Sequence, residues 1–475
     1  MSTPVSHPMI MHNDPIAPVI FGVTLILIAA LIGRYSARYF NQPTVLGELL
    51  MGVVVGNLLY LFGYDLIVIL REGIACTKIV QIVMSGTPVS ETISSVMEPQ
   101  TAALFLEIAR GPHGQDYLSI AQAVDTFSRY GVIFLLFHVG LNTCVEELKH
   151  VGINAIRVAL MGVLLPFSLG FMVTWWLTPE ASHAMHMFLG ATLGATSIGI
   201  TARVLQDLNA TDSKESHVIL GAAVMDDVLG LVMLSIVSGI VVTGSMEINS
   251  IFHTILLASM FIGSTLLLGP YIIRLLIRLL SRLDVMEAKL FISFVFVMLL
   301  AWFANLAGLA TIIGAFAAGL LLHEKHFSAW GGSHRSQKYS IKDLFAPLES
   351  ILAPIFFVLM GIQVKLETFL DWNVIFLASG LLIAAIAGKM AAGVVAGKNL
   401  NRLSIGVGMM PRGEVGLVFA AIGKTLGVID SAMFSAVVLM VIITTLATPP
   451  LLKIAMKRGV HDESDQRGKK IKLCE

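Results

Sequence analysis

Two adjacent carboxylates, Asp226 and Asp227, interrupt the otherwise apolar segment GAAVMDDVLGLVML. A charged side chain at the centre of a bilayer costs about 2.5–3.5 kcal/mol on insertion scales, so such residues are by default functional. Adjacent helical residues point about 100° apart, so one carboxylate can hold a structural partner while the other faces a water-filled cavity. Their proximity disfavours joint ionisation and favours proton exchange at one of them. The alternative is a buried ion pair with a structural role alone.

Lys389 is the only charged residue between Asp371 and Lys398. A buried lysine needs a carboxylate, and the Asp226–Asp227 pair provides the nearest reasonable candidates. The alternative is that the lysine snorkels to a membrane interface, which its central position in the segment disfavours. The pattern therefore predicts an ion pair between this lysine and one of the two aspartates.

Two apolar segments carry residues that interrupt a helix. In VGMMPRGEVGLVFA, Pro411 and Gly413 flank Arg412, and Glu414 follows. The other segment, GATSIGITARV, contains Gly194, Thr196, Ser197 and Gly199. A broken membrane helix leaves unpaired backbone groups and opposed helix dipoles, which need charges or hydroxyls nearby. Transporters place ion sites at such breaks, so we expect one here; the alternative for Glu414 is a local partner of Arg412 with no part in transport.

The elements that must position these residues are membrane helices. Of the 475 residues, 56% are hydrophobic and 13% are charged, which excludes a soluble enzyme built around one large core. Apolar blocks of roughly 20 residues, the length that spans a bilayer, recur along the chain. About thirteen spans are predicted, of which the eighth and ninth could merge, at 16–34, 45–63, 118–141, 153–177, 183–206, 214–243, 250–281, 286–308, 309–322, 345–364, 373–397, 402–427 and 431–455.

The remaining segments suggest no second domain. The 31 basic residues balance the 31 acidic ones, so no overall basic field exists to hold nucleic acid. The N-terminus lacks the basic region of a cleaved signal peptide, so the first span should remain. An extracytoplasmic insert at 64–117 is predicted to hold short surface helices, and 456–475 is predicted to be a short, solvated cytoplasmic tail. The chain is therefore predicted to be a single transmembrane domain, 1–475.

The distribution of Lys and Arg predicts the orientation. With the N-terminus outside, the inner segments and the tail carry 21 Lys and Arg residues, and the outer segments carry 5. Cytoplasmic segments of membrane proteins carry an excess of these residues. The pattern therefore predicts an outer N-terminus, a cytoplasmic C-terminus and an odd number of spans.

The two predicted breaks lie in the fifth and twelfth spans. Seven is an odd separation, so in a zigzag topology the two helices run in opposite directions. Spans four to six and eleven to thirteen are then predicted to form an inverted repeat around a site at the membrane midplane. In that repeat the aspartate pair aligns loosely with Thr444-Thr445.

Two other function classes fit less well. An intramembrane aspartyl protease needs aspartates on two helices that face each other, whereas these two are adjacent. A passive channel needs polar residues along a continuous pore, whereas this sequence has one isolated charged site at mid-depth. The pattern favours a secondary transporter with alternating access, and we do not expect an enzyme.

Several motifs together resemble the cation:proton antiporter superfamily, in the branch of the bacterial Nap-type Na+/H+ antiporters and Kef-type K+ efflux systems. The resemblance extends from about residue 16 to 455, although the 64–117 insert departs from the usual short connection. The motifs are QPTVLGELLMGVVVG at 42–56, IFLLFHVGLN at 133–142, LGATSIGITARVL at 193–205, AAVMDDVLG at 222–230, APIFFVLMGI at 353–362, GKMAAG at 388–393 and PRGEVGLVFA at 411–420.

The resemblance implies an all-α polytopic fold with inverted-topology repeats and two crossed broken helices. It implies a homodimer in which each protomer has a dimerisation part, including the first span, and a core that moves relative to it. Position by position, Asp227 matches the carboxylate that binds Na+ and the proton, and Asp226 matches the acid that pairs with the family lysine, here Lys389. Thr196 and Ser197 match the unwound part of the crossing helix near the ion.

The resemblance also bears on the ion. Kef-type members usually have an amide where Asp226 stands and carry a cytosolic nucleotide-binding domain, and this chain has the acid and no such domain. We therefore expect electrogenic Na+/H+ exchange, with Li+ as a second candidate cation. Kef-type K+/H+ exchange is the alternative. No cofactor is expected besides the transported Na+ and H+. The expected setting is a bacterial inner membrane, with lipid as the other contact.

Overall fold

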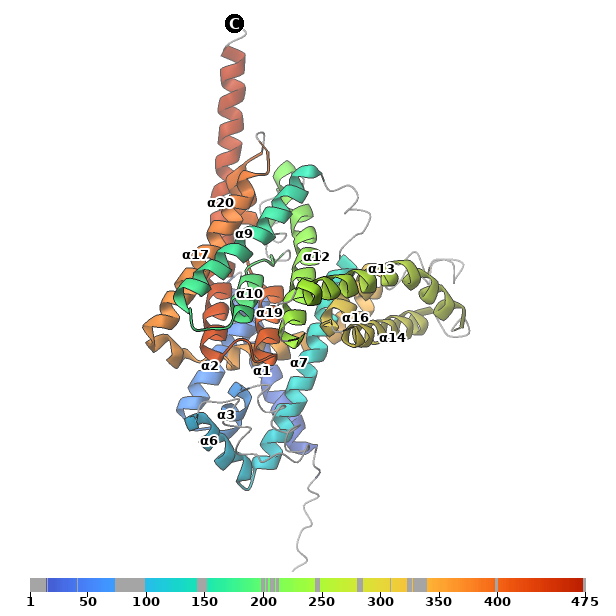
Figure 1. The fold of residues 1–475 in the computed structure, drawn as a ribbon, viewed down its shortest axis with the longest axis vertical. Coiled ribbons are helices and arrows are strands. Elements are labelled where there is room, and N and C mark those ends of the chain that lie inside the picture. The colour runs from blue at the N-terminus through green and yellow to red at the C-terminus, as the bar shows by residue number, and fades with distance from the viewer. Residues whose placement is uncertain are drawn as a thin grey trace, which may run out of the picture.

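The computed structural model describes residues 14, 16–40, 42–72, 99–142, 152–197, 201, 204, 205, 210, 213–243, 248–279, 285–307, 309–322, 327, 340–397 and 400–472. These residues form helices and connections without β-strands (Figure 1). The helices are α1 (Ala17–Tyr39), α2 (Thr44–Leu61), α3 (Asp65–Glu72), α6 (Pro99–Arg110), α7 (Gly114–Asn142), α9 (Ile153–Leu177), α10 (His183–Thr192), α12 (Lys214–Thr243), α13 (Ile248–Leu279), α14 (Val285–Leu306), α15 (Thr311–Leu321), α16 (Ile341–Ile362), η2 (Leu366–Leu370), α17 (Trp372–Val394), α18 (Arg402–Gly408), α19 (Glu414–Thr425) and α20 (Ser431–Lys472).

The all-α membrane architecture predicted from the apolar blocks is confirmed. Within the described ranges, nine helices are long and apolar enough to cross a membrane, and the apolar helices α15 and α19 are shorter. Each of the thirteen predicted spans contains at least one helix, while a total of thirteen crossings stays a prediction. The eighth and ninth predicted spans do not merge, because α14 ends at Leu306 and α15 begins at Thr311.

The described part of the predicted 64–117 insert contains the two short helices α3 and α6, and 73–98 lie outside the described residues. α3 and α6 contact each other and α7, at the end of the molecule opposite the C-terminal part of α20 (Figure 1). The helix α20 also differs from the expected span, because it continues beyond residue 455 through the charged tail to Lys472.

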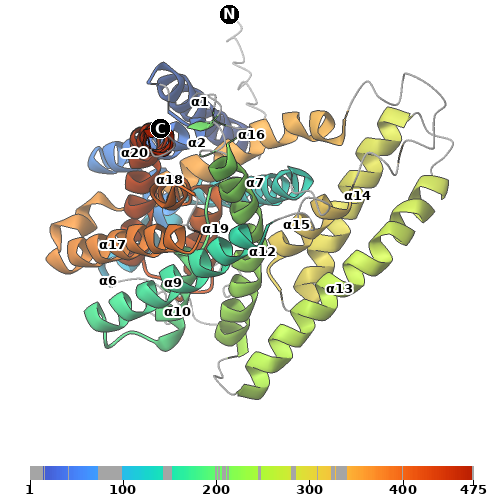
Figure 2. The same cartoon turned by 90° about the horizontal axis from the view of Figure 1, so that it is seen from above.

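The helices pack as two groups. The scaffold half contains α1, α2, α3, α6, α7 and α13 to α16, and the crossing half contains α9, α10, α12 and α17 to α20. Helices contact each other extensively within each half, whereas the main helix contact between the halves is α12 with α13. The short helix η2 follows α16 in the chain and contacts α17 and α20 of the crossing half. Figure 2 shows α13 and α14 along one side of the molecule, and α9, α10 and α17 along the other.

The close contact of α9 with α17 depends on a glycine. Gly388 of α17 lies against Pro166 of α9, and a β-carbon at Gly388 would lie 2.9 Å from the backbone nitrogen and Cα of that proline. Small residues let membrane helices approach each other closely, which dispersion contacts then stabilise. The contact matters for function because Lys389, the next residue, is thereby held at a fixed depth between the two helices.

We expect Gly388→Ala to lower the thermal stability of the detergent-solubilised protein. The added methyl meets backbone atoms, which cannot rotate away, and overpacking typically costs about 1–3 kcal/mol. Gly263→Ala in α13 is the matched control, because a β-carbon there meets no heavy atom within 4 Å. Equal melting temperatures for the two variants would contradict this account of the α9–α17 contact.

Candidate functional site

Both predicted helix breaks are present, and they lie against each other. Residues 193–197 follow α10 without helical structure, and residues 409–413 separate α18 from α19 in the same way. The backbone N–H of Ser197 donates a hydrogen bond to the carbonyl oxygen of Pro411 at 2.9 Å. The two broken helices of the crossing half therefore meet at their non-helical middles, as the resemblance implies.

The carbonyl groups exposed by the breaks are hydrogen-bonded. Unsatisfied backbone groups inside a membrane cost several kcal/mol each, so donors have to be supplied. Six carbonyl oxygens accept as follows: Gly194 from Lys389 Nζ at 2.9 Å, Ala195 from Arg412 Nη1, Gly408 from Thr201 Oγ1 at 2.6 Å, Met409 from Thr196 Oγ1 at 3.3 Å, Pro411 from the Ser197 N–H, and Arg412 from Thr445 Oγ1. Two of the donors are cations, which also offset the negative end of the α10 dipole.

Asp226 forms an ion pair with Lys389, and both side chains are fully buried. The Lys389 ammonium donates to Asp226 Oδ2, and the same carboxylate oxygen accepts from Thr196 Oγ1 at 2.6 Å. The Thr196 hydroxyl carries one proton, so its bonds to Asp226 and to Met409 alternate. Asp226 is thus tied to both sides of the crossing, through Lys389 of α17 and through the break after α10.

Gly162 of α9 makes room for this ion pair. A β-carbon at Gly162 would lie 3.1 Å from Lys389 Nζ and 3.5 Å from Asp226 Oδ1. No charge or polar residue next to Gly162 in the sequence marks it, so its role follows only from the packing of α9 against α12 and α17. Any larger residue there would push the ammonium or the carboxylate out of its present position.

Asp227 follows Asp226 on α12 and is 3% exposed. As adjacent helical residues they point in different directions, and Lys389 pairs with Asp226 while remaining within electrostatic range of Asp227. Ser197 is buried in the crossing, as is Thr196. Carboxylate, hydroxyl and backbone carbonyl oxygens are hard ligands of the kind that transporters use at unwound helices to coordinate Na+.

Arg412 lies between the two breaks and is fully buried. Besides the bond to Ala195, its Nε and Nη2 have no hydrogen-bond partner among the described residues. The side chain of Glu414 lies outside those residues, so an ion pair between Arg412 and Glu414 stays a prediction. Arg412 therefore acts in the structure as a buried positive charge at the end of α10.

Besides Gly162, two contributions to this region and one in the scaffold half were not predicted from the sequence. The Thr201 hydroxyl donates a hydrogen bond to the last carbonyl of α18, and the Thr445 hydroxyl of α20 donates one to the carbonyl of Arg412. Thr444, its neighbour in the loose repeat match, bonds only carbonyls of its own helix within the described hydrogen bonds. Glu48 forms a buried ion pair with Arg34 between α2 and α1; a lone acid in the apolar segment at 42–56 was its only signal.

The sequence model described as "Sodium/hydrogen exchanger, transmembrane" matches residues 25–458. The chain belongs to the sodium/hydrogen exchanger family. This exchanger is 33% identical over 462 residues to the high-affinity Na+/H+ antiporter NhaS3 of Synechocystis, covering 95% of the chain and 93% of the relative. It is 31% identical to the Na+/H+-K+ antiporter GerN of Bacillus cereus, covering 77% of the chain and 91% of the relative.

The exchanger also has the fold of a solved antiporter. The sodium proton antiporter MjNhaP1 of Methanocaldococcus jannaschii superposes with a TM-score of 0.61 at 17% identity, covering 94% of this chain and 98% of that one. The predicted resemblance to the cation:proton antiporters is confirmed, and the family is one of transporters rather than enzymes. The crossing of two broken helices around buried charges is accordingly the candidate ion site.

The ion pair between Asp226 and Lys389 predicts strong thermodynamic coupling. Asp226→Asn or Lys389→Met leaves one buried charge unpaired, and each should destabilise the protein by about 3–5 kcal/mol. The double variant should be more stable than the sum of the two losses predicts. Thermal unfolding of the wild type, the two single variants and the double variant measures the coupling. Strict additivity of the two losses of stability would show that the two side chains are not partners.

The more exposed ion pair between Asp125 and Arg129 on α7 is the matched control. Exposed ion pairs contribute about 0–1 kcal/mol, so Asp125→Asn should leave the melting temperature almost unchanged. A loss as large as that of Asp226→Asn would mean that thermal unfolding does not distinguish buried from exposed pairs in this protein.

Proposed function

We propose that the protein is a secondary antiporter that exchanges Na+ for H+ by alternating access, with Asp227 as the carboxylate that binds them in turn. The observation that carries the proposal is the commitment of Asp226 to Lys389 and Thr196 at the crossing. We assign the exchange to Asp227, the adjacent buried carboxylate on α12, because it matches the ion-binding carboxylate of the resembling family. The names of NhaS3 and MjNhaP1 support Na+ as the cation.

The crossing supplies the other groups that the exchange requires. Thr196, Ser197 and the carbonyl groups of the breaks provide neutral oxygens beside the carboxylates. Lys389 and Arg412 compensate the charge of the acids in the state without Na+. Release of Asp226 from Lys389 would free a second oxygen ligand and change the proton affinity of the site at the same time.

K+/H+ exchange is the second candidate. The name of GerN includes K+ beside Na+, although GerN matches a smaller share of this chain than NhaS3 does. Hard oxygen ligands bind both cations, so the ligand types at the crossing do not separate them. Initial rates of exchange in proteoliposomes with Na+, Li+ or K+ at equal concentrations give the order of preference directly.

The membrane setting follows the same proposal. The crossing half would move relative to the scaffold half, and two copies would associate through scaffold faces that include α1. The outward face of α1 is apolar and exposed, with Phe21 at 65% and Leu31 at 68%, so it suits a partner protomer or lipid. We place the protein in a bacterial inner membrane with the N-terminus outside and the C-terminus in the cytoplasm.

Asp227→Asn should abolish Na+/H+ exchange while leaving the protein folded and inserted. An amide does not take up or release a proton near neutral pH, and it lacks the charge that holds the cation. Cation-dependent dequenching of a pH dye in vesicles measures the loss, and Asp116→Asn on α7, with a half-exposed side chain, is the control. Exchange at the wild-type rate in Asp227→Asn would rule out this assignment.

We expect two protons to cross for each Na+, so that turnover responds to voltage. A potential of 100 mV corresponds to about 2.3 kcal/mol per elementary charge moved. The reversal point of exchange, measured at several Na+ and pH gradients under a set potential, should therefore shift with voltage. A reversal point at equal Na+ and H+ ratios, independent of voltage, would indicate one-for-one exchange and leave Asp226 a structural partner of Lys389.

A further inference from the structure

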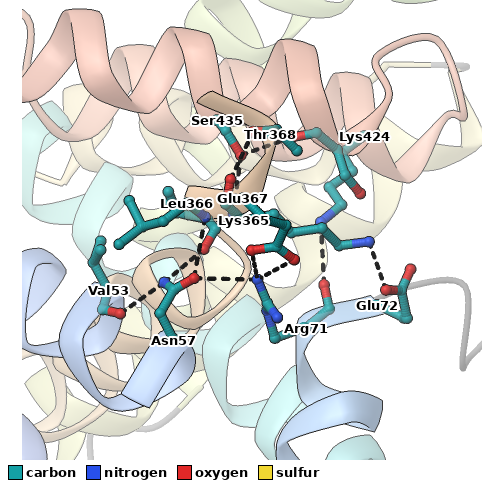
Figure 3. Close-up of polar contacts among 12 residues, drawn as sticks. Val53, Asn57, Arg71, Glu72, Lys365, Leu366, Glu367, Thr368, Lys424 and Ser435 are labelled. Carbon is teal, nitrogen blue, oxygen red and sulfur yellow. Dashed lines mark hydrogen bonds and ion pairs between the residues drawn. The ribbon is translucent and has the colours of Figure 1, made fainter. Parts of the chain in front are cut away.

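A polar cluster surrounds η2, the short helix that connects the two halves (Figure 3). Arg71 Nη2 contacts both carboxylate oxygens of Glu367 at 2.6 and 2.7 Å, and Lys365 Nζ pairs with Glu72 at 2.7 Å. The Asn57 amide accepts from the backbone of Leu366 and donates to the carbonyl of Val364. Two ion pairs and a side-chain amide therefore fix η2 to α2 and α3 of the scaffold half.

The crossing half reaches the same cluster through weaker contacts. Lys424 Nζ, near the end of α19, donates to Gln363 Oε1 at 3.1 Å and to the backbone carbonyl of Arg71 at 3.5 Å. Ser435 Oγ of α20 accepts from the backbone of Lys365 at 3.1 Å. Both acceptors of the Lys424 ammonium are neutral oxygens, and the ammonium also lies 4.9 Å above the ring of Phe434 in its own half.

The difference in strength determines where the cluster can separate. The Arg71–Glu367 pair has two charged partners and contacts of 2.6 and 2.7 Å, so it is stronger than the longer bonds from the Lys424 ammonium to neutral oxygens at 3.1 and 3.5 Å. Arg71 is also buried and lies over the ring of Tyr60. Separation of the crossing half from α3 and from the end of α16 would therefore break the bonds of Lys424 to Gln363 and Arg71. The ion pairs fix Arg71 and the segment that follows Gln363, so the two acceptors of Lys424 keep their positions.

Lys424 is also connected to the ion site by a rigid element. α19 begins at Glu414, directly after the crossing, and its 12 residues span about 18 Å. The two ends of this helix move together, so docking of Lys424 restrains the residues that follow Arg412. A contact present in one conformation and absent from another shifts the equilibrium between them.

We propose that Lys424 is a positioning residue for exchange: it docks the crossing half on Gln363 at the end of α16 and on Arg71 of α3, and it has to be released before the ion site opens towards α3. The inference rests on the proposed exchange function. The contact of Lys424 with Gln363 and Arg71, here called the latch, is distinct from the ion ligands. In the proposed orientation α3 lies on the outer side. The latch therefore stabilises the state closed to the outside.

The signature of a latch is opposite shifts in apparent affinity on the two sides of the membrane. Lys424→Met removes the ammonium and keeps the side-chain length, so the outward-open state becomes more populated. The half-saturating Na+ concentration should fall roughly two- to tenfold from the outside and rise from the inside, because apparent affinity follows the competent fraction. Damage to the ion site would raise both values.

Lys424→Arg keeps the charge and should restore values close to those of the wild type. Lys453→Met, an exposed lysine on α20, is the matched control and should change neither value. Parallel changes on the two sides of the membrane in Lys424→Met, or no change, would overturn the proposal.

A cross-link tests the latch independently of which cation is carried. Gln363→Cys and Lys424→Cys would be combined in a background with Cys76, Cys144 and Cys474 replaced by serine. A short bis-thiosulfonate reagent would join the two thiols, forming one disulfide with each cysteine and releasing a sulfinate each time, and a reducing agent would cleave the link. Exchange should stop on cross-linking and return on cleavage, whereas treatment with the reagent should not change the exchange rate of either single cysteine variant. Undiminished exchange by the cross-linked protein would contradict the latch proposal. The exchange function itself is tested separately, by the Asp227→Asn variant.

Discussion

The structure depends on hydrogen-bond donors for carbonyl groups that two helices leave unpaired inside a membrane. In water such a break would be solvated, but in hydrocarbon each carbonyl has to be satisfied by the protein. Lys389 and Arg412 supply charged donors, and Thr201 and Thr445 supply neutral ones. Once the ammonium of Lys389 and the guanidinium of Arg412 are fixed at that depth, at least one carboxylate is required beside them, so the backbone constraint and the proposed ion site have the same origin.

The partition of the helices into two halves follows from the same arrangement. The members of the crossing half share the broken helices as neighbours, and Lys389, Arg412 and Thr196 make their polar contacts at residues 193–197 and 409–413. The scaffold half has its own tight contacts, including α2 against α16 and α7 against α15 and α16. With few extensive contacts between the halves, η2 and its ion pairs become the place where their relative position can be controlled.

The sequence predicted the elements better than the contacts between them. Apolar blocks located the helices, and Pro411 with Gly413 located one break, because these signals are local. The partner of Lys389 was narrowed to two aspartates, since buried charges have few alternatives. The roles of Gly162 and Thr201 had no local signal, because they depend on residues some 200 positions away that only the folded bundle brings close. The contacts of Lys424 were missed for the same reason.

The charges at the crossing constrain how the exchange can be coupled. Among its described side chains, Lys389 and Arg412 balance Asp226 and Asp227 when both acids are ionised. One bound Na+ and one bound proton each raise the net charge of the site by one. In one-for-one exchange the Na+-loaded and the proton-loaded site therefore cross the membrane with the same net charge. A second proton makes the two loaded states differ by one charge. The ion pair is where that proton can be accommodated, because Na+ binding that draws Asp226 away from Lys389 weakens the hold of the lysine on its proton. A lysine that only fixed the fold would keep its partner in every state, so the proposed electrogenic exchange requires that Lys389 and Asp226 separate during the cycle.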